Sequence, residues 1–200
     1  MSDVPATLVK KLRDLTGAGM MECKAALQDA SGNIEEATTI LRKRGLAQAA
    51  KKSGRSTSEG LIGSYIHLGG KIGVLVELNC ESDFVARTDD FQTLLKELAL
   101  QVAAANPQFV RREDVPADVL DRERGIYRAQ MENSGKPANV IEKIVEGKLN
   151  SFYEQVVLLD QPSIRDPKVT VSQLVQAAIA KLGENIGVAR FVRFKVGEVG

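Results

Sequence analysis

The residues that could carry chemistry in this sequence are few and scattered. The chain has one histidine, His67, and two cysteines, Cys23 and Cys80. No serine or cysteine motif lies near His67, and neither cysteine has companion ligands at metal-binding spacing. Carboxylates such as Asp89 and Asp114 stand where helices are expected to start, which is a structural position for an acidic residue. We therefore predict no catalytic residue, no metal, no cofactor and no enzymatic activity.

One glycine-rich segment invites comparison with a phosphate-binding loop. Thr16-Gly-Ala-Gly-Met20 contains two glycines, but it lacks the full fingerprint, the following Lys-Ser/Thr pair and a preceding strand. A break between two helices, made by the glycines, is the better interpretation. Met20 and Met21 come directly after it, and a methionine pair at a helix start can either fill the core or form an adaptable contact surface.

The segment from Asn79 to Arg87 is unusual because it places large apolar residues where polar turn residues are expected. Phe84 and Val85 follow Asp83 directly. One interpretation is a capped helical turn, with Ser82 or Asp83 as N-cap and Phe84 folded into the core. The other is an exposed aromatic wedge that anchors in a pocket of a partner protein. The residues alone leave both open.

Charge and composition narrow the classes of partner. Lysine and arginine number 27 against 26 aspartates and glutamates, so the chain lacks the strong positive field of nucleic-acid or anionic-membrane binders. Tryptophan is absent, and no apolar run approaches the roughly 20 residues that span a bilayer. The first residues also lack the features of a signal peptide. We expect no nucleic-acid or membrane partner, a cytoplasmic location and reduced, buried thiols.

The N-terminal quarter of the chain predicts a small helical module. Apolar residues recur at helical spacing from Thr7 to about Lys52, with breaks at Thr16-Gly-Ala-Gly and Ser31-Gly-Asn. These patterns indicate three short helices, the third capped by Asn33 or Ser31. We assign residues 1–52 to a three-helix partner-binding module, residues 53–58 to a linker, and residues 59–200 to a core domain.

The core domain is predicted to combine a small sheet with helices. The β-rich runs 61–67 and 71–79 are joined by Gly69-Gly70, a pair suited to a hairpin turn, and residues 186–196 form a last strand. The second strand is continuously apolar, which favours cover on both faces. Helices are expected over 90–105, 116–132, 137–159 and 171–182. The predicted fold is α+β, a small antiparallel sheet packed with helices.

Three strands leave an exposed edge or face. Natural proteins cover long exposed edges, so we infer that a second copy of the chain completes the sheet. The expectation is a homodimer formed through the core domain.

Several sequence blocks, taken together, resemble the elongation factor Ts family from end to end. The blocks are Thr16-Gly-Ala-Gly-Met-Met21, Cys23-Lys-Ala-Ala-Leu27, Ala49-Ala-Lys-Lys52, Ile72-Gly-Val-Leu-Val76, Asn79-Cys80, Asp83-Phe-Val-Ala86, Ser134-Gly-Lys-Pro137, Ile144-Val-Glu-Gly147, Leu158-Leu-Asp-Gln-Pro162 and Gly183-Glu-Asn-Ile186. The resemblance implies a helical module similar to a ubiquitin-associated domain and an α+β dimerisation core. Many members carry two copies of the core, and this chain is similar to short homodimeric forms with one.

The resemblance also implies a partner and a mechanism. The partner would be elongation factor Tu, GDP-bound and nucleotide-free, and the activity guanine-nucleotide exchange during translation elongation in protein biosynthesis. Ser82, Asp83, Phe84 and Val85 would displace the partner's magnesium ion, with Phe84 as the wedge. The remaining partner-binding residues carried over from the family are Met20, Met21, Lys24, His67, Leu182 and Gly183. The alternative from a different class is a non-catalytic adaptor that binds the GTPase without changing its rate of GDP release; an enzyme is the least favoured reading.

Overall fold

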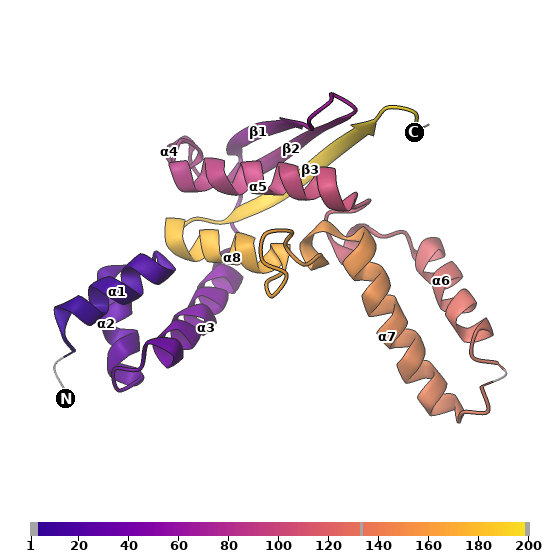
Figure 1. Cartoon of the computed structure of the whole chain (residues 1–200), viewed down its shortest axis with the longest axis horizontal. Helices are drawn as coiled ribbons and strands as arrows, with labels where there is room; N and C mark the ends of the chain where they lie inside the picture. The colour runs from indigo at the N-terminus through magenta and orange to yellow at the C-terminus, as the bar shows by residue number, and fades with distance from the viewer. Residues whose placement is uncertain (1–3, 133, 199–200) are drawn as a thin grey trace. The chain divides into compact units, whose positions relative to one another are not determined.

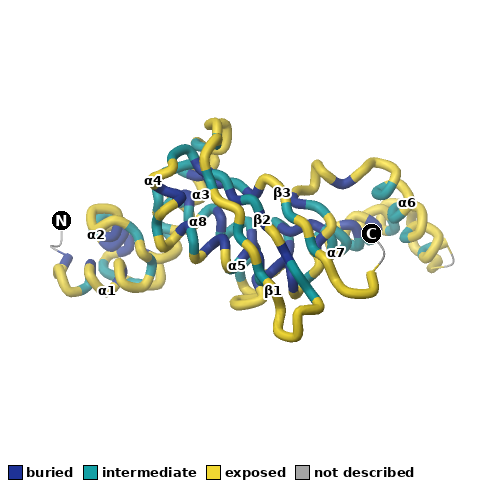
Figure 2. Tube along the Cα trace, turned by 90° about the horizontal axis from the view of Figure 1, so that it is seen from above, coloured by how far each residue is buried: buried dark blue, intermediate teal, exposed yellow. Residues whose placement is uncertain are grey.

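The N-terminal part of the chain forms three consecutive helices, as predicted. The computed structural model describes residues 4–132 and 134–198. Its first helices are α1 (Ala6–Thr16), α2 (Met20–Asp29) and α3 (Ile34–Lys52). They enclose a small hydrophobic cluster in which Leu12 and Leu27 are fully buried. Figure 2 colours these helices by burial, with buried and exposed residues along each of them.

The breaks between these helices follow the chemistry that the sequence predicts. Gly17 ends α1 in the left-handed conformation, with φ of 68°, and its N–H donates to the Arg13 carbonyl. Asn33 caps α3, because its Oδ1 accepts hydrogen bonds from the N–H groups of Glu35 (2.9 Å) and Glu36 (3.1 Å). The third helix then continues to Lys52, immediately before the residues that we assign to the linker.

The rest of the chain mixes strands and helices, and the predicted α+β fold is confirmed. Over the described ranges the structure has eight α-helices and one three-stranded antiparallel sheet of order β1-β2-β3 (Figure 1). The elements after α3 are β1 (Glu59–Ile66), β2 (Ile72–Cys80), α4 (Asp83–Ala86), α5 (Asp89–Ala105), the 3-10 turn η1 (Arg112–Asp114), α6 (Ala117–Ala129), α7 (Ala138–Val156), the 3-10 turn η2 (Leu158–Asp160), α8 (Val171–Leu182) and β3 (Ile186–Lys195).

The hairpin between β1 and β2 is confirmed in position and in turn chemistry. Gly69 and Gly70 have φ of 88° and 68°, a region that residues with a Cβ rarely occupy. The His67 N–H donates to the Ile72 carbonyl at 2.9 Å and closes the hairpin. The whole turn is exposed, as Figure 2 shows.

The prediction that both faces of β2 are covered by protein holds within this chain for one face only. Val74, Val76, Leu78 and Cys80 are buried, whereas Leu75 between them is 47% exposed. Side chains alternate between the faces of a strand, so the chain covers one face of β2 and leaves Leu75 on the other. A continuous apolar run therefore does not mean here that helices pack on both sides.

The chain divides into two compact units. Unit 1 consists of Met1–Leu61, Leu78–Leu94 and Gln173–Gly187, and unit 2 of Ile62–Glu77, Leu95–Ser172 and Val188–Gly200. The three N-terminal helices all belong to unit 1. The assignment of 1–52, 53–58 and 59–200 to module, linker and core stays a prediction.

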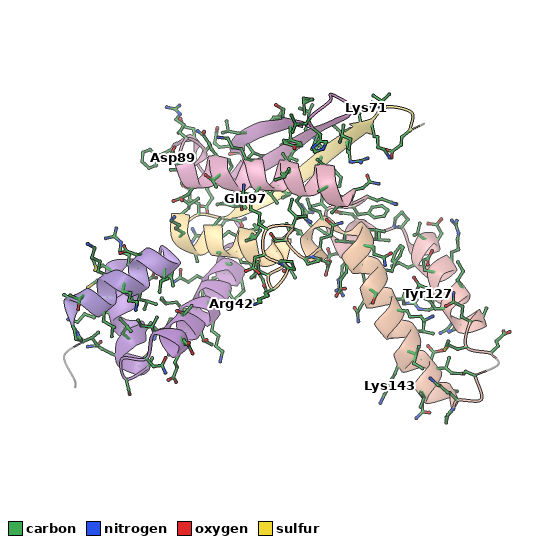
Figure 3. The ribbon with its side chains drawn as sticks, in the orientation of Figure 1. Arg42, Lys71, Asp89, Glu97, Tyr127 and Lys143 are labelled. Carbon is green, nitrogen blue, oxygen red and sulfur yellow. The ribbon has the colours of Figure 1, made fainter. Side chains whose placement is uncertain are left out.

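Within unit 2, α6 and α7 form an antiparallel helical hairpin held by charged side chains (Figure 1). Arg128 makes a bidentate ion pair with the Glu142 carboxylate, with both N–O distances at 2.9 Å. Tyr127 of α6 points toward α7 (Figure 3), where the Lys148 ammonium lies 5.4 Å from its ring centroid. These contacts hold the hairpin at its surface, since α6 has no buried residue.

Neither a membrane-spanning helix nor a cluster of metal ligands is found among the described residues. None of the helices placed in the structure combines the length and apolarity needed to cross a membrane. In the same ranges no three histidine, cysteine, aspartate or glutamate side chains gather where they could hold a metal ion.

Gly60 at the start of β1 allows a stability prediction, because its backbone lies against β2. A Cβ at this position would lie 2.3 Å from the Leu78 carbonyl oxygen, and its φ is 151°. We expect Gly60→Ala to lower the free energy of unfolding by more than about 2 kcal/mol, measured as a shift in the urea midpoint. Gly147→Ala is the matched control, because a Cβ there meets open space in the middle of α7. That change should raise stability by about 0.5–1 kcal/mol, and equal small effects at both positions would contradict this packing.

Candidate functional site

The turn that follows β2 is built by its N-cap residue. Ser82 is extended, with φ of −131° and ψ of 153°, and it stands directly before the single helical turn α4. Its Oγ accepts a hydrogen bond from the Val85 N–H at 3.4 Å. The extended backbone of β2 thus passes into a helical turn through a side-chain cap, as one of the two interpretations expects.

Phe84 itself does not fold into the core. Its side chain is 76% exposed, whereas Val85 and Ala86, the next residues, are 6% and 4% exposed. Val85 and Ala86 therefore anchor the turn while Phe84 stands in solvent. The structure therefore combines parts of both interpretations. Ser82 caps the turn, as the first expects, and Phe84 is exposed, as the second expects.

Asp83 lies beside Phe84 on the exposed side of the turn. Its carboxylate pairs with Arg87 at 2.6 Å across one helical turn, and both side chains are more than half exposed. An exposed pair of this kind contributes only about 0.3–0.5 kcal/mol. The pair is weak enough to exchange for contacts with a partner protein at little cost.

The turn is also held by two residues of the last sequence segment of unit 1, Glu184 and Asn185, which the sequence did not predict. The Glu184 carboxylate accepts hydrogen bonds from Glu81 N (3.1 Å), Ser82 N (3.0 Å) and Ser82 Oγ (2.6 Å). In return, the Glu81 carboxylate accepts the N–H of Asn185 at 2.6 Å. The available signal was the block Gly183-Glu-Asn-Ile186, which entered the sequence analysis only as part of the family resemblance.

Cys80 contacts the same turn from the buried side. Its Sγ donates to the Ser82 carbonyl at 3.1 Å. Burial, and next the negative charge of Glu184, raise the pKa of the Cys80 thiol above its usual value of 9.0. The thiol therefore stays protonated near neutral pH and serves as a hydrogen-bond donor. Cys23 and Cys80 are both free and buried, which confirms the expectation of buried thiols.

The helical module presents its methionines outward. Met20 is 46% exposed and Met21 is 75% exposed at the start of α2, and Lys24 one turn later is partly buried. The buried face of α2 is made instead by Cys23, Ala26 and Leu27. Exposure on this scale favours a contact surface over core filler for the methionine pair.

Nine of the ten predicted site residues lie in unit 1, and His67 lies in unit 2. Leu182 ends α8 partly buried, and Gly183 follows with φ of 80°. Nearby, the Lys181 ammonium pairs with Asp90 at 2.7 Å. His67 is exposed next to the hairpin turn, where its Nδ1 lies 3.0 Å from the Tyr65 hydroxyl.

These residues have the side-chain types of a recognition surface. The predicted site offers an exposed phenyl ring, two exposed thioethers, a lysine and an acidic side chain. An exposed phenyl ring of this kind can enter a partner's pocket as an aromatic anchor.

The exposure difference between adjacent residues makes a prediction about folding. Phe84→Ala should change the free energy of unfolding by less than about 0.5 kcal/mol, because little of its surface is buried. Val85→Ala should cost about 2 kcal/mol, because it empties space in a packed site. Urea unfolding of the two variants beside the unaltered protein measures both values. A loss of stability in Phe84→Ala as large as in Val85→Ala would show that the ring packs inside.

Comparison with known proteins assigns the family. The family model described as "Elongation factor TS" matches residues 3–198. A relative named elongation factor Ts from Solibacter usitatus is 57% identical over 198 residues, covering 99% of this chain and 93% of its own length. The elongation factor Ts of Fervidobacterium nodosum is 60% identical over 196 residues, covering 98% of this chain and all of its own length. The chain therefore belongs to the elongation factor Ts family of translation elongation factors.

Proposed function

We propose that this protein is a guanine-nucleotide exchange factor that binds elongation factor Tu in its GDP-bound and nucleotide-free states. The observation that carries the proposal is the exposed Phe84 on a turn anchored by Val85 and Ala86. In a member of the elongation factor Ts family, this ring is the wedge expected to displace the partner's magnesium ion. Membership in the family supports the role in translation, and we place the protein in the cytoplasm on that ground.

Magnesium displacement explains how such a wedge speeds GDP release. The ion neutralises charge between the phosphates of the nucleotide and the protein ligands that face them. Removing it takes away a large part of the affinity for GDP. Binding is reciprocal, so a protein that binds the nucleotide-free GTPase more tightly weakens GDP binding by the same factor. No covalent bond changes, and we infer that the protein is not an enzyme.

Each residue of the turn has a role in this scheme. Phe84 enters between two helices of the partner's nucleotide-binding domain, as the family resemblance implies. Asp83 is its polar neighbour, released from the exposed pair with Arg87. Ser82 caps the turn and Val85 anchors it in this chain. An aromatic residue presented on a fixed backbone loses little conformational entropy on binding, which suits a hot spot.

The remaining predicted contacts surround the wedge with weaker interactions. Met20, Met21 and Lys24 on α2 would touch the partner's nucleotide-binding domain. Exposed methionines suit this role because the thioether adapts to irregular surfaces. His67, Leu182 and Gly183 would lie at or near the rest of the interface. We propose residues 1–52 as the partner-binding module, 53–58 as its linker and 59–200 as the core.

Release of a fluorescent GDP analogue from elongation factor Tu tests the proposal. The unaltered protein at saturating concentration should speed release by about 100-fold, if the coupling between the two ligands is expressed mainly in the GDP off-rate. Phe84→Ala should lose most of this acceleration while remaining folded. Because the proposed wedge acts by removing magnesium, the acceleration should shrink when a chelator has already removed the ion.

The control for this experiment is Ile126→Ala, which truncates another exposed apolar side chain, on α6. It should leave the acceleration unchanged. Full acceleration by Phe84→Ala would move the mechanism to other residues. Binding of the unaltered protein without any change in release rate would identify an adaptor and refute exchange.

We also propose that two copies pair through the bare face of the sheet in unit 2. Ile62, Ile66, Leu75, Val192 and Phe194 are between 38% and 68% exposed. A Cβ on Gly73 would lie 3.1 Å from Ile66 Cδ1, which places Ile66 on the face of Gly73 and Leu75.

The third strand contributes to this face as well. The Arg193 side chain turns toward the helices, where its Nε donates to the Ala103 carbonyl at 3.3 Å. Val192 and Phe194 therefore point the opposite way. Arg190 pairs with Glu77 at 2.7 Å, so the charged residues of this face are already matched. An apolar face with its charges paired is suited to a second copy of itself.

Sedimentation can test this dimer. The unaltered protein should sediment at twice its chain mass of 21.7 kDa. Leu75→Glu combined with Phe194→Glu should give monomers, since each dimer would bury four unpaired carboxylates. Ile126→Glu on α6 is the control and should remain dimeric. Monomers of the unaltered protein at high concentration would remove the proposal.

A further inference from the structure

We propose that Glu184 is the positioning residue that presents Phe84 to the partner. The inference rests on the proposed function, in which Phe84 is the wedge. It adds a residue that has no part in the predicted site and does not need to touch the partner. The argument begins with the instability of the turn on its own.

The α4 turn cannot hold its shape by local interactions alone. It contains four residues, and an isolated helix of that length is far below the length at which helices persist in water. Its exposed pair of Asp83 with Arg87 adds little. Moreover, a phenyl ring gains free energy by leaving water, so hydrophobic burial favours conformations in which Phe84 folds inward. Something must therefore fix the backbone that holds the ring outside.

Glu184 fixes the backbone immediately before the turn. Its Oε2 accepts two consecutive peptide N–H groups, those of Glu81 and Ser82, at 3.1 and 3.0 Å. A carboxylate that accepts two adjacent amides sets the orientation of both peptide planes. Hydrogen bonds to a charged acceptor are also roughly twice as strong as neutral ones. The direction in which the chain leaves β2 is thus set by a residue 102 positions later.

The second oxygen of Glu184 fixes the cap. Ser82 Oγ donates its proton to Glu184 Oε1 at 2.6 Å and accepts the Val85 N–H at 3.4 Å. Because a hydroxyl has one proton, donation to the carboxylate leaves a lone pair for Val85. Glu184 therefore orients the hydroxyl that caps the turn. In the sequence, Phe84 lies between the capping residue Ser82 and the capped residue Val85.

Neighbouring contacts hold Glu184 in place. Asn185 donates its backbone N–H to the Glu81 carboxylate at 2.6 Å and its side-chain Nδ2 to the Arg55 carbonyl at 2.8 Å. The segments 81–82 and 184–185 thus exchange hydrogen bonds in both directions. Residue 55 lies in the proposed linker, so the linker to the helical module is hydrogen-bonded to the same segment, 184–185.

Glu184→Gln tests the inference, because the amide keeps the size of the side chain and removes its charge and one acceptor. Amide hydrogen exchange at Ser82 and Val85 should become about tenfold faster, as expected when charge-assisted hydrogen bonds are lost. The maximal rate of GDP release at saturating factor should fall about tenfold. The concentration that gives half-maximal release should change less, because Met20, Met21 and Lys24 still bind.

The double variant Glu184→Gln with Phe84→Ala separates positioning from a general structural effect. If Glu184 acts through the ring, its substitution changes release by less than twofold once the ring is absent. Losses that multiply in the double variant would overturn the proposal. Unchanged amide exchange at Ser82 and Val85 in the single variant would overturn it as well.

Two further variants serve as controls. Asn185→Ala removes the contact with the Arg55 carbonyl but keeps the backbone N–H, so protection at Ser82 and Val85 should remain; equal loss in both variants would overturn the assignment to Glu184. Glu142→Gln breaks an exposed ion pair of unit 2 and should leave release unchanged. If Glu184→Gln does not fold, Ser82→Ala removes one of the three bonds to Glu184 together with the cap on Val85, and should give a loss of about threefold or more in the same direction.

The failures of the two proposals can be told apart. If the unaltered protein does not accelerate GDP release, the proposed function fails. Amide exchange in Glu184→Gln then still decides whether Glu184 holds the turn, because that measurement needs no partner. If the unaltered protein accelerates release and Glu184→Gln does so equally well, only the positioning role fails.

Discussion

The exposure of Phe84 depends on hydrogen bonds that come from the other end of unit 1. A short helical turn gains nothing by keeping a phenyl ring in water, since burying such a side chain is worth about 2 kcal/mol. The Glu184 carboxylate, which accepts two peptide N–H groups and the Ser82 hydroxyl, opposes that tendency by fixing the backbone. Val85 and Ala86, both buried, complete the anchorage. The surface around Phe84 therefore exists only when the segment after α8 has folded against the end of β2.

A second constraint is that the chain covers only one face of its sheet. The buried residues of β2 alternate with Leu75, which is 47% exposed, and Phe194 of β3 is 68% exposed. Leaving such residues in water forgoes hydrophobic free energy that a second copy could recover. The same physical principle thus runs through both proposed interfaces. In each, the backbone holds apolar side chains in solvent.

Much of the fold could be predicted because its signals are local. The helical spacing of Leu12 and Leu27, the Asn33 cap and the Gly69-Gly70 turn each depend on residues a few positions apart. The cover of β2 could not be predicted in this way. A run such as Ile72 to Leu78 shows that its residues avoid water, but it does not say whether helices of the same chain or another molecule will cover them.

The exposure of the candidate residues could not be predicted from the sequence, and their role in binding stays a prediction. Ser82 caps the turn whether Phe84 points inward or outward, so the capping pattern left both conformations open. Glu184 decides between them, and it stands 102 positions from Ser82 with no periodic pattern to connect the two. A contact between two distant segments leaves no trace in either segment alone. Residues proposed to bind a partner can therefore be nominated from their type, whereas residues that orient them emerge only once the chain is folded.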